Sequence, residues 1–124
     1  MRLAIDRAGR VPDVVFADAS GDPELDALEA AAITDVLGPR VPVAVPKTMT
    51  GRLYAGGAAL DLGWAALALH HGVIPPSVNL DGALIGGLDV VTDARAHSLN
   101  TAMVVARGTG GFNSVAVLCR PSDR

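Results

Sequence analysis

Three charged side chains lie in loops where they could form one site: Asp18, Lys47 and Arg52. Asp18 directly follows the apolar run 14–17, and Lys47 and Arg52 flank a short loop behind a second apolar run. Taken singly, Asp18 is typical of a local turn, Arg52 of a solvated charge near a helix start, and Lys47 of a tether to Glu29 or to a backbone carbonyl. Aspartate is a poor hydrogen-bond donor at neutral pH and arginine keeps its proton, so neither suits general acid–base chemistry.

The histidines and the cysteine predict no further chemistry. His70 and His71 lie in the last turn of an expected helix, where positive charge complements the helix dipole. His97 is isolated in a loop, so we predict no metal and no cofactor. Cys119 is the single cysteine, which excludes an internal disulfide and fits a reducing compartment. Its place on a terminal strand predicts an inert side chain.

Two elements near the N-terminus position Asp18. Residues 2–9 are expected to end a helix at Gly9, and 13–17 form a buried strand. Asp22 and Pro23 are typical of a helix start, and the pattern predicts a helix to about residue 37. Its expected apolar face carries Leu25, Leu28, Ala32 and Val36.

The remaining elements predict an α/β domain with a mixed sheet. Residues 42–45 form a second buried strand, in which Pro42 favours an edge or an entry position. A helix over about 53–71 is apolar nearly all round and is expected to be buried on most sides. Residues 73–98 contain no convincing element, whereas 101–106 and 114–119 predict neighbouring strands, plausibly antiparallel. The glycine-rich turn that joins them, which includes Thr109, lacks the ending of a phosphate-binding loop.

Composition excludes several classes of protein. Half of the 124 residues are apolar and the net charge is −3, so disorder is not expected. Aromatic residues are 3% and no Lys/Arg block exists, which argues against a nucleic-acid partner. The longest apolar run is interrupted by Asp61 and falls short of the ~20 residues of a membrane span. The N-terminus lacks the apolar core of a signal peptide, so we expect a soluble cytoplasmic protein without a membrane partner.

Four stretches in order resemble the β-ketoacyl synthases of the thiolase fold. Residues 16–21, with Pro23, Asp26 and Glu29 following, are similar to the family's Ala-His-Gly-Thr-Gly-Thr loop and its trailing Asp and Glu. The others are 46–52 for the Lys-Ser-x-x-Gly-His loop, 72–80 for the Gly-x-x-Pro-Pro-x-x-Asn segment, and 110–113 for the Gly-Phe-Gly-Gly-x-Asn turn. The resemblance implies that residues 1–124 form the C-terminal half of the thiolase fold, a mixed sheet layered with helices. The N-terminal half, which bears the nucleophilic cysteine in active members, is absent.

The departures from these motifs are the most informative positions. Asp18 replaces the first catalytic histidine, Arg52 replaces the second, Thr109 replaces the phenylalanine of the turn, and Lys47 is retained. Ketosynthases use the two histidines in decarboxylation and in stabilising an oxyanion. Asp18, Arg52, Lys47 and Thr109 are therefore interpreted as degenerate active-site positions, with no catalytic residue among them. Because the two histidines share one pocket in the family, we predict that Asp18 and Arg52 approach each other.

This pattern resembles the chain length factors of aromatic type II polyketide synthases. The resemblance implies a non-catalytic subunit that forms a heterodimer with an active ketosynthase alpha subunit and works with an acyl carrier protein. Two alternatives stay open. One is a divergent β-ketoacyl synthase, an acyltransferase whose cysteine lies in the missing half; the other is a truncated, inactive reading frame.

Overall fold

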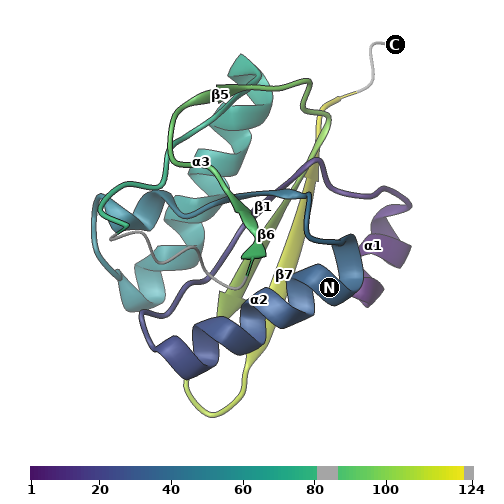
Figure 1. Cartoon of the computed structure of the whole chain (residues 1–124). Helices are drawn as coiled ribbons and strands as arrows, with labels where there is room; N and C mark the ends of the chain where they lie inside the picture. The colour runs from purple at the N-terminus through teal and green to yellow at the C-terminus, as the bar shows by residue number, and fades with distance from the viewer. Residues whose placement is uncertain (81–86, 122–124) are drawn as a thin grey trace.

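A five-stranded mixed sheet organises the chain, and helices cover both of its faces (Figure 1). The computed structural model describes residues 1–80 and 87–121. In chain order the elements are α1 (Arg2–Ala8), β1 (Val14–Phe16), α2 (Pro23–Leu37), β2 (Pro42–Ala44), the 3₁₀ turns η1 (Pro46–Thr48) and η2 (Tyr54–Gly56), α3 (Gly57–His71), β3 (Val73–Ile74), β4 (Asp89–Val90), β5 (Arg95–Ala96), β6 (Thr101–Arg107) and β7 (Asn113–Cys119). The expected α/β class is confirmed.

The strand order of the sheet is β4-β2-β1-β6-β7. The first three pairings are parallel, and β7 runs antiparallel to β6 through the glycine-rich hairpin, as the sequence predicts. Pro42 begins β2 and so occupies an entry position, where its missing N–H is tolerated. The edge alternative is wrong, because β4 lies beyond β2.

Alternating side chains divide the core into two layers. Val14 and Phe16 of β1 pack with α3 on one face, whereas Val15 packs with α2 on the other. The same alternation continues along β6, where Val104 faces α3 and Met103 faces α2. The central strands are buried on both sides, which is why they appear in the sequence as continuous apolar runs.

The buried face of α2 differs from the expected one. Leu28 is 66% exposed and Leu25 is also exposed, while Glu29, Ala30 and Ile33 are buried. The apolar pattern predicted the wrong inner face, because the carboxylate of Glu29 lies on the face that packs against the sheet. Glu29 is accepted there because backbone N–H groups satisfy its oxygens. The cap is as expected, since the Asp22 side chain accepts hydrogen bonds from the backbone N–H groups of residues 24 and 25.

Helix α3 starts later and is less buried than expected. Tyr54 has a φ of 48°, a left-handed conformation that interrupts the helical backbone, and the α-helix begins at Gly57. Asp61, Ala65, Ala68 and Leu69 are buried against the sheet, but Leu67 on the other side is 52% exposed. The helix is therefore half-buried in this chain rather than enclosed on most sides.

The segment 73–98 contains short strands that the sequence did not indicate. β3 and β5 pair as a two-stranded antiparallel sheet, and β4 extends the main sheet beside β2. Each has two residues, too short for a periodic signal; the part of the expected long surface segment at 81–86 lies outside the described residues. Within the described residues, no helix has both the length and the apolar character needed to span a membrane.

Candidate functional site

Four backbone amides fix the loop that carries Asp18. The N–H groups of Asp18 and Ala19 donate to the two carboxylate oxygens of Glu29 at 2.8 and 2.9 Å. The next two, of Ser20 and Gly21, donate to the two oxygens of Asp26 at 2.7 and 2.9 Å. Asp26 and Glu29 are three residues apart on α2, so one face of the helix presents both carboxylates to the loop. Two carboxylates of α2 therefore hold the loop that follows β1 through four backbone N–H groups.

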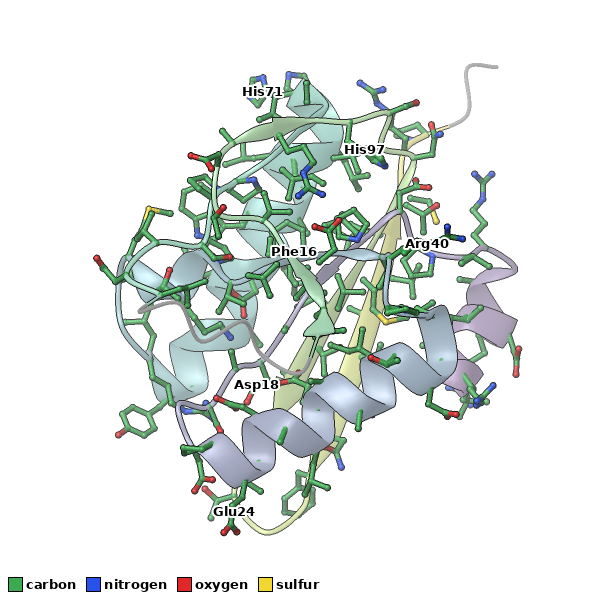
Figure 2. All side chains as sticks on the ribbon, viewed as in Figure 1. Phe16, Asp18, Glu24, Arg40, His71 and His97 are labelled. Atoms are coloured by element: carbon green, nitrogen blue, oxygen red, sulfur yellow. The ribbon has the colours of Figure 1, made fainter. Side chains whose placement is uncertain are left out.

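Asp18 and Arg52 form an ion pair, which confirms the expected approach. Arg52 Nη1 donates to Asp18 Oδ2 at 3.3 Å. The Asp18 side chain is 8% exposed and that of Arg52 is 35% exposed, so Arg52 is partly buried as expected. In Figure 2, Asp18 lies beside the N-terminal half of α2, while His71 and His97 lie at the opposite end of the molecule. Neither of these histidines reaches the pair.

Lys47 binds a carbonyl and a carboxylate, but not the carboxylate suggested above. Its Nζ donates to the Asp18 backbone carbonyl at 2.8 Å, as one of the two expected tethers. The predicted tether to Glu29 is wrong, because Nζ forms an ion pair with Asp61 Oδ2 at 2.7 Å instead. Asp61 lies on α3 with 1% of its side chain exposed; apart from this ion pair, neither of its carboxylate oxygens has a hydrogen-bond partner among the described residues.

Arg107 is the functional residue that the sequence analysis missed. It ends β6, and its Nη1 donates to the Leu25 carbonyl at 2.9 Å. Its Nη2 lies 3.1 Å from Glu29 Oε2 and 3.3 Å from Asp26 Oδ1. Its Nε lies 3.5 Å from Asp18 Oδ2 without forming a hydrogen bond. The parallel pairing of β1 with β6 places Arg107 near Asp18, since the carboxyl ends of parallel neighbours lie at the same edge of a sheet.

The result is a compact cluster of opposite charges. It contains three cations and four carboxylates, namely Lys47, Arg52, Arg107, Asp18, Asp26, Glu29 and Asp61. Burial raises the pKa of Glu29, and the N–H groups of residues 18 and 19 together with Arg107 partly oppose this. Burial also raises the pKa of Asp61, against the influence of Lys47. Desolvation thus outweighs pairing at both carboxylates.

A cavity of about 50 Å³ adjoins this cluster. Asp18, Lys47, Arg52, Asp61 and Arg107 contribute its charged wall, and residues of loop 51–54 and the start of α3 complete it. No serine, cysteine or histidine lines its described part, and its polar side chains are these five charged residues and Tyr54. The arrangement is suited to charge pairing.

The other predicted positions lie outside this cavity. Thr109 is exposed in the β6–β7 turn and does not line it. Cys119 is exposed at the end of β7. No group of three potential ligands that could hold a metal occurs among residues 1–80 and 87–121. The cavity therefore brings together three of the four predicted site residues, and Thr109 remains a prediction.

Comparisons with known proteins agree with the motifs. The family model of the β-ketoacyl synthase C-terminal domain matches residues 1–81. The tetracenomycin polyketide synthase ketoacyl synthase beta subunit of Streptomyces glaucescens is 52% identical over 97% of this chain, and the chain covers 31% of it. The alpha subunit of the same synthase is 39% identical over 97% of this chain, with 30% of it covered.

Solved structures show the same fold. The ishigamide ketosynthase/chain length factor has a TM-score of 0.90 and 31% identity, over 98% of this chain and 32% of that chain. A β-ketoacyl synthase from Burkholderia phymatum shares the fold with a TM-score of 0.82 and 22% identity, over 98% of this chain and 31% of that one. The chain thus spans about a third of the length of these relatives. Since the family model matches well over half of its residues, the chain belongs to the β-ketoacyl synthase family through that family's C-terminal domain.

Proposed function

We propose that this chain is part of a non-catalytic, chain-length-determining subunit of an aromatic polyketide synthase. It acts beside an active ketosynthase alpha subunit that condenses malonyl units carried by an acyl carrier protein. The observation that carries the proposal is the Asp18–Arg52 ion pair, formed at 3.3 Å by the two residues that the motifs place where active enzymes have histidines.

The electrostatics of this pair oppose condensation. Decarboxylative condensation builds negative charge on a thioester oxygen, which hydrogen-bond donors must stabilise. Losing one such donor typically lowers the rate by a factor of about 10²–10³. Both histidines are replaced, Asp18 adds a negative charge, and Arg52 is already held by it. What remains for the subunit is to pack against the active ketosynthase and to restrict the space for the growing chain.

The pattern of identities supports the same function. The chain is 52% identical to the beta subunit of the tetracenomycin polyketide synthase but only 39% identical to the alpha subunit of the same synthase. The solved structure of similar fold and 31% identity is named a ketosynthase/chain length factor. Residues 1–124 are proposed as the C-terminal domain of the subunit, with Asp18, Arg52, Lys47 and Thr109 as degenerate active-site positions. Its location is proposed to be the cytoplasm.

A chimeric beta subunit tests this proposal directly. Residues 1–124 replace the matching segment of the S. glaucescens beta subunit, which is then assayed with acyl carrier protein and malonyl thioester, with and without the alpha subunit. We expect condensation only in the mixture, with product length depending on which beta subunit is present. An inactive mixture, under conditions in which the unmodified beta subunit gives an active one, would count against the proposed function.

A matched control makes this assay interpretable. The unmodified beta subunit reports the activity of the pair before grafting. A chimera carrying Arg2→Met, which alters an exposed side chain far from the cavity, reports the effect of an unrelated substitution. We expect the Arg2→Met chimera to have the same activity as the chimera without this substitution.

A further inference from the structure

The carboxylate of Asp18 lies between two guanidinium groups from different parts of the chain. Its Oδ2 is 3.3 Å from Arg52 Nη1, on the loop before α3, and 3.5 Å from Arg107 Nε, at the end of β6. Two guanidinium groups around one carboxylate are a typical arrangement for recognising a bound acid. Here the acid belongs to the chain itself.

Arg107 is held in place independently of Asp18. Its Nη1 donates to the Leu25 carbonyl and its Nη2 contacts Glu29 and Asp26. Glu29 is in turn fixed by the backbone N–H groups of residues 18 and 19, which any side chain at position 18 leaves intact. Truncating Asp18 therefore leaves the guanidinium of Arg107 in its present position.

The side chain of Asp18 satisfies this site incompletely. Arg107 Nε is buried 3.5 Å from Oδ2 and has no hydrogen-bond partner among the residues that the structure describes. The adjoining cavity has a volume of about 50 Å³. Since about 10–15 Å³ accommodates one water molecule, this space together with that of a removed carboxylate suits an acid of two or three carbons.

We propose that Arg52 and Arg107 form a carboxylate-binding site that Asp18 occupies from within the chain. In the wild-type protein the internal carboxylate excludes free acids, including the carboxylate of a malonyl group. Without it, the site binds a short free carboxylate such as acetate through the same two guanidinium groups. The proposal deepens the proposed function because it concerns the same pocket, but its test requires neither a ketosynthase nor condensation.

Chemical rescue of Asp18→Ala tests the proposal on the chain 1–124. The midpoint of thermal unfolding is measured in sodium acetate and in sodium chloride of equal ionic strength, over about 1–100 mM. We expect Asp18→Ala to unfold at a lower temperature than wild type and to be stabilised saturably by acetate relative to chloride. A ligand at 100 times its dissociation constant shifts the folding equilibrium by a factor of about 100.

Matched variants identify the residues that bind. Asp18→Asn keeps the size of the side chain without its charge and fills the site, so acetate should not stabilise it beyond chloride. Asp18→Ala/Arg107→Met lacks one guanidinium and should lose the response. Wild type should show no acetate-specific shift, because its site is occupied.

Each outcome of the rescue decides the proposal. An equal response to acetate and chloride in Asp18→Ala overturns it. A stabilisation by acetate beyond chloride in the Asp18→Ala/Arg107→Met variant or in wild type, as large as that of Asp18→Ala, also overturns it. If Asp18→Ala does not fold in chloride, the less drastic Asp18→Ser is titrated in the same way. Folding or stabilisation of that variant by acetate supports the proposal, and its failure to respond overturns it. None of these results depends on whether the chimera condenses malonyl units.

Discussion

Removing either partner of the Lys47–Asp61 ion pair should strongly destabilise the chain. Nζ and Oδ2 are 2.7 Å apart, and the side chains are 11% and 1% exposed. At this distance and an effective dielectric constant of about 20, the attraction is about 6 kcal/mol. The desolvation of two charges offsets much of this energy, so the intact pair contributes little net stability.

The singly substituted chains retain one buried charge without its partner. We expect Lys47→Met and Asp61→Ala each to lower the free energy of unfolding by about 3–5 kcal/mol. The double variant contains neither charge, and methionine can fill part of the vacated space. Its stability should lie within about 2 kcal/mol of wild type, so that the coupling between the two positions is several kcal/mol.

The pH dependence of Lys47→Met has a definite sign. Burial raises the pKa of Asp61 above 3.8, and Lys47 opposes that rise, so the pKa of Asp61 rises further in Lys47→Met. The folded state then holds the proton more tightly than the unfolded state. Stability is greatest below the unfolded pKa and is lost as the pH rises through the folded pKa. The deficit of Lys47→Met relative to Lys47→Met/Asp61→Ala should therefore shrink as the pH falls from 7 toward 4.

Urea unfolding of the four chains measures these quantities, with comparison of the m-values to check that unfolding stays two-state. The matched control is Arg2–Asp35, an ion pair of similar length, 2.8 Å, whose side chains are 66% and 73% exposed. Its coupling from Arg2→Met and Asp35→Ala should be at most about 1 kcal/mol. Equal coupling at the two pairs would refute the reasoning, because burial would then have no effect.

Three further predictions concern the helices. Gly72 ends α3 with a φ of 68°, so Gly72→Ala should lower the free energy of unfolding by about 1–2 kcal/mol, as measured by urea unfolding. In the same assay, Gly63→Ala should leave the free energy of unfolding unchanged or raise it by up to about 1 kcal/mol, because no atom lies within 4 Å of the added Cβ. Asp22→Ala removes the side chain that accepts hydrogen bonds from two backbone N–H groups of α2, and it should lower the free energy of unfolding by about 1 kcal/mol. A loss below about 0.3 kcal/mol in the same assay would argue against the cap. The isolated chain should bind a hydrophobic dye through the exposed side of α3, and Leu67→Glu should reduce the dye fluorescence; unchanged fluorescence would place the binding surface elsewhere.

Local patterns were sufficient to predict most of the regular elements. The four main strands lie within about two residues of their predicted bounds. For β1, β2 and β6 the reason is that strands buried on both faces produce continuous apolar runs. The Asp22–Pro23 start of α2 and the glycine end of α1 were also evident, since capping depends on single residues with specific backbone conformations.

The inner faces of the helices were harder to predict. Periodicity predicted that Leu28 lies on the buried face of α2. In the structure Glu29 lies on that face instead, because backbone N–H groups of the loop donate hydrogen bonds to its buried carboxylate. The strands β3, β4 and β5 were missed because two residues cannot carry a periodic signal.

The sequence by itself determined the α/β order of elements, the family motifs and the replacement of two histidines by Asp18 and Arg52. The motifs also predicted that these two residues approach each other, but only the tertiary structure decided which further charges join them. Arg107 enters the site because β6 pairs in parallel with β1, and Asp61 enters because α3 packs against the same sheet. These residues are 89 and 43 positions from Asp18 in the chain. Contacts at such separations leave no local pattern, since strand pairing and helix packing alone bring the side chains together.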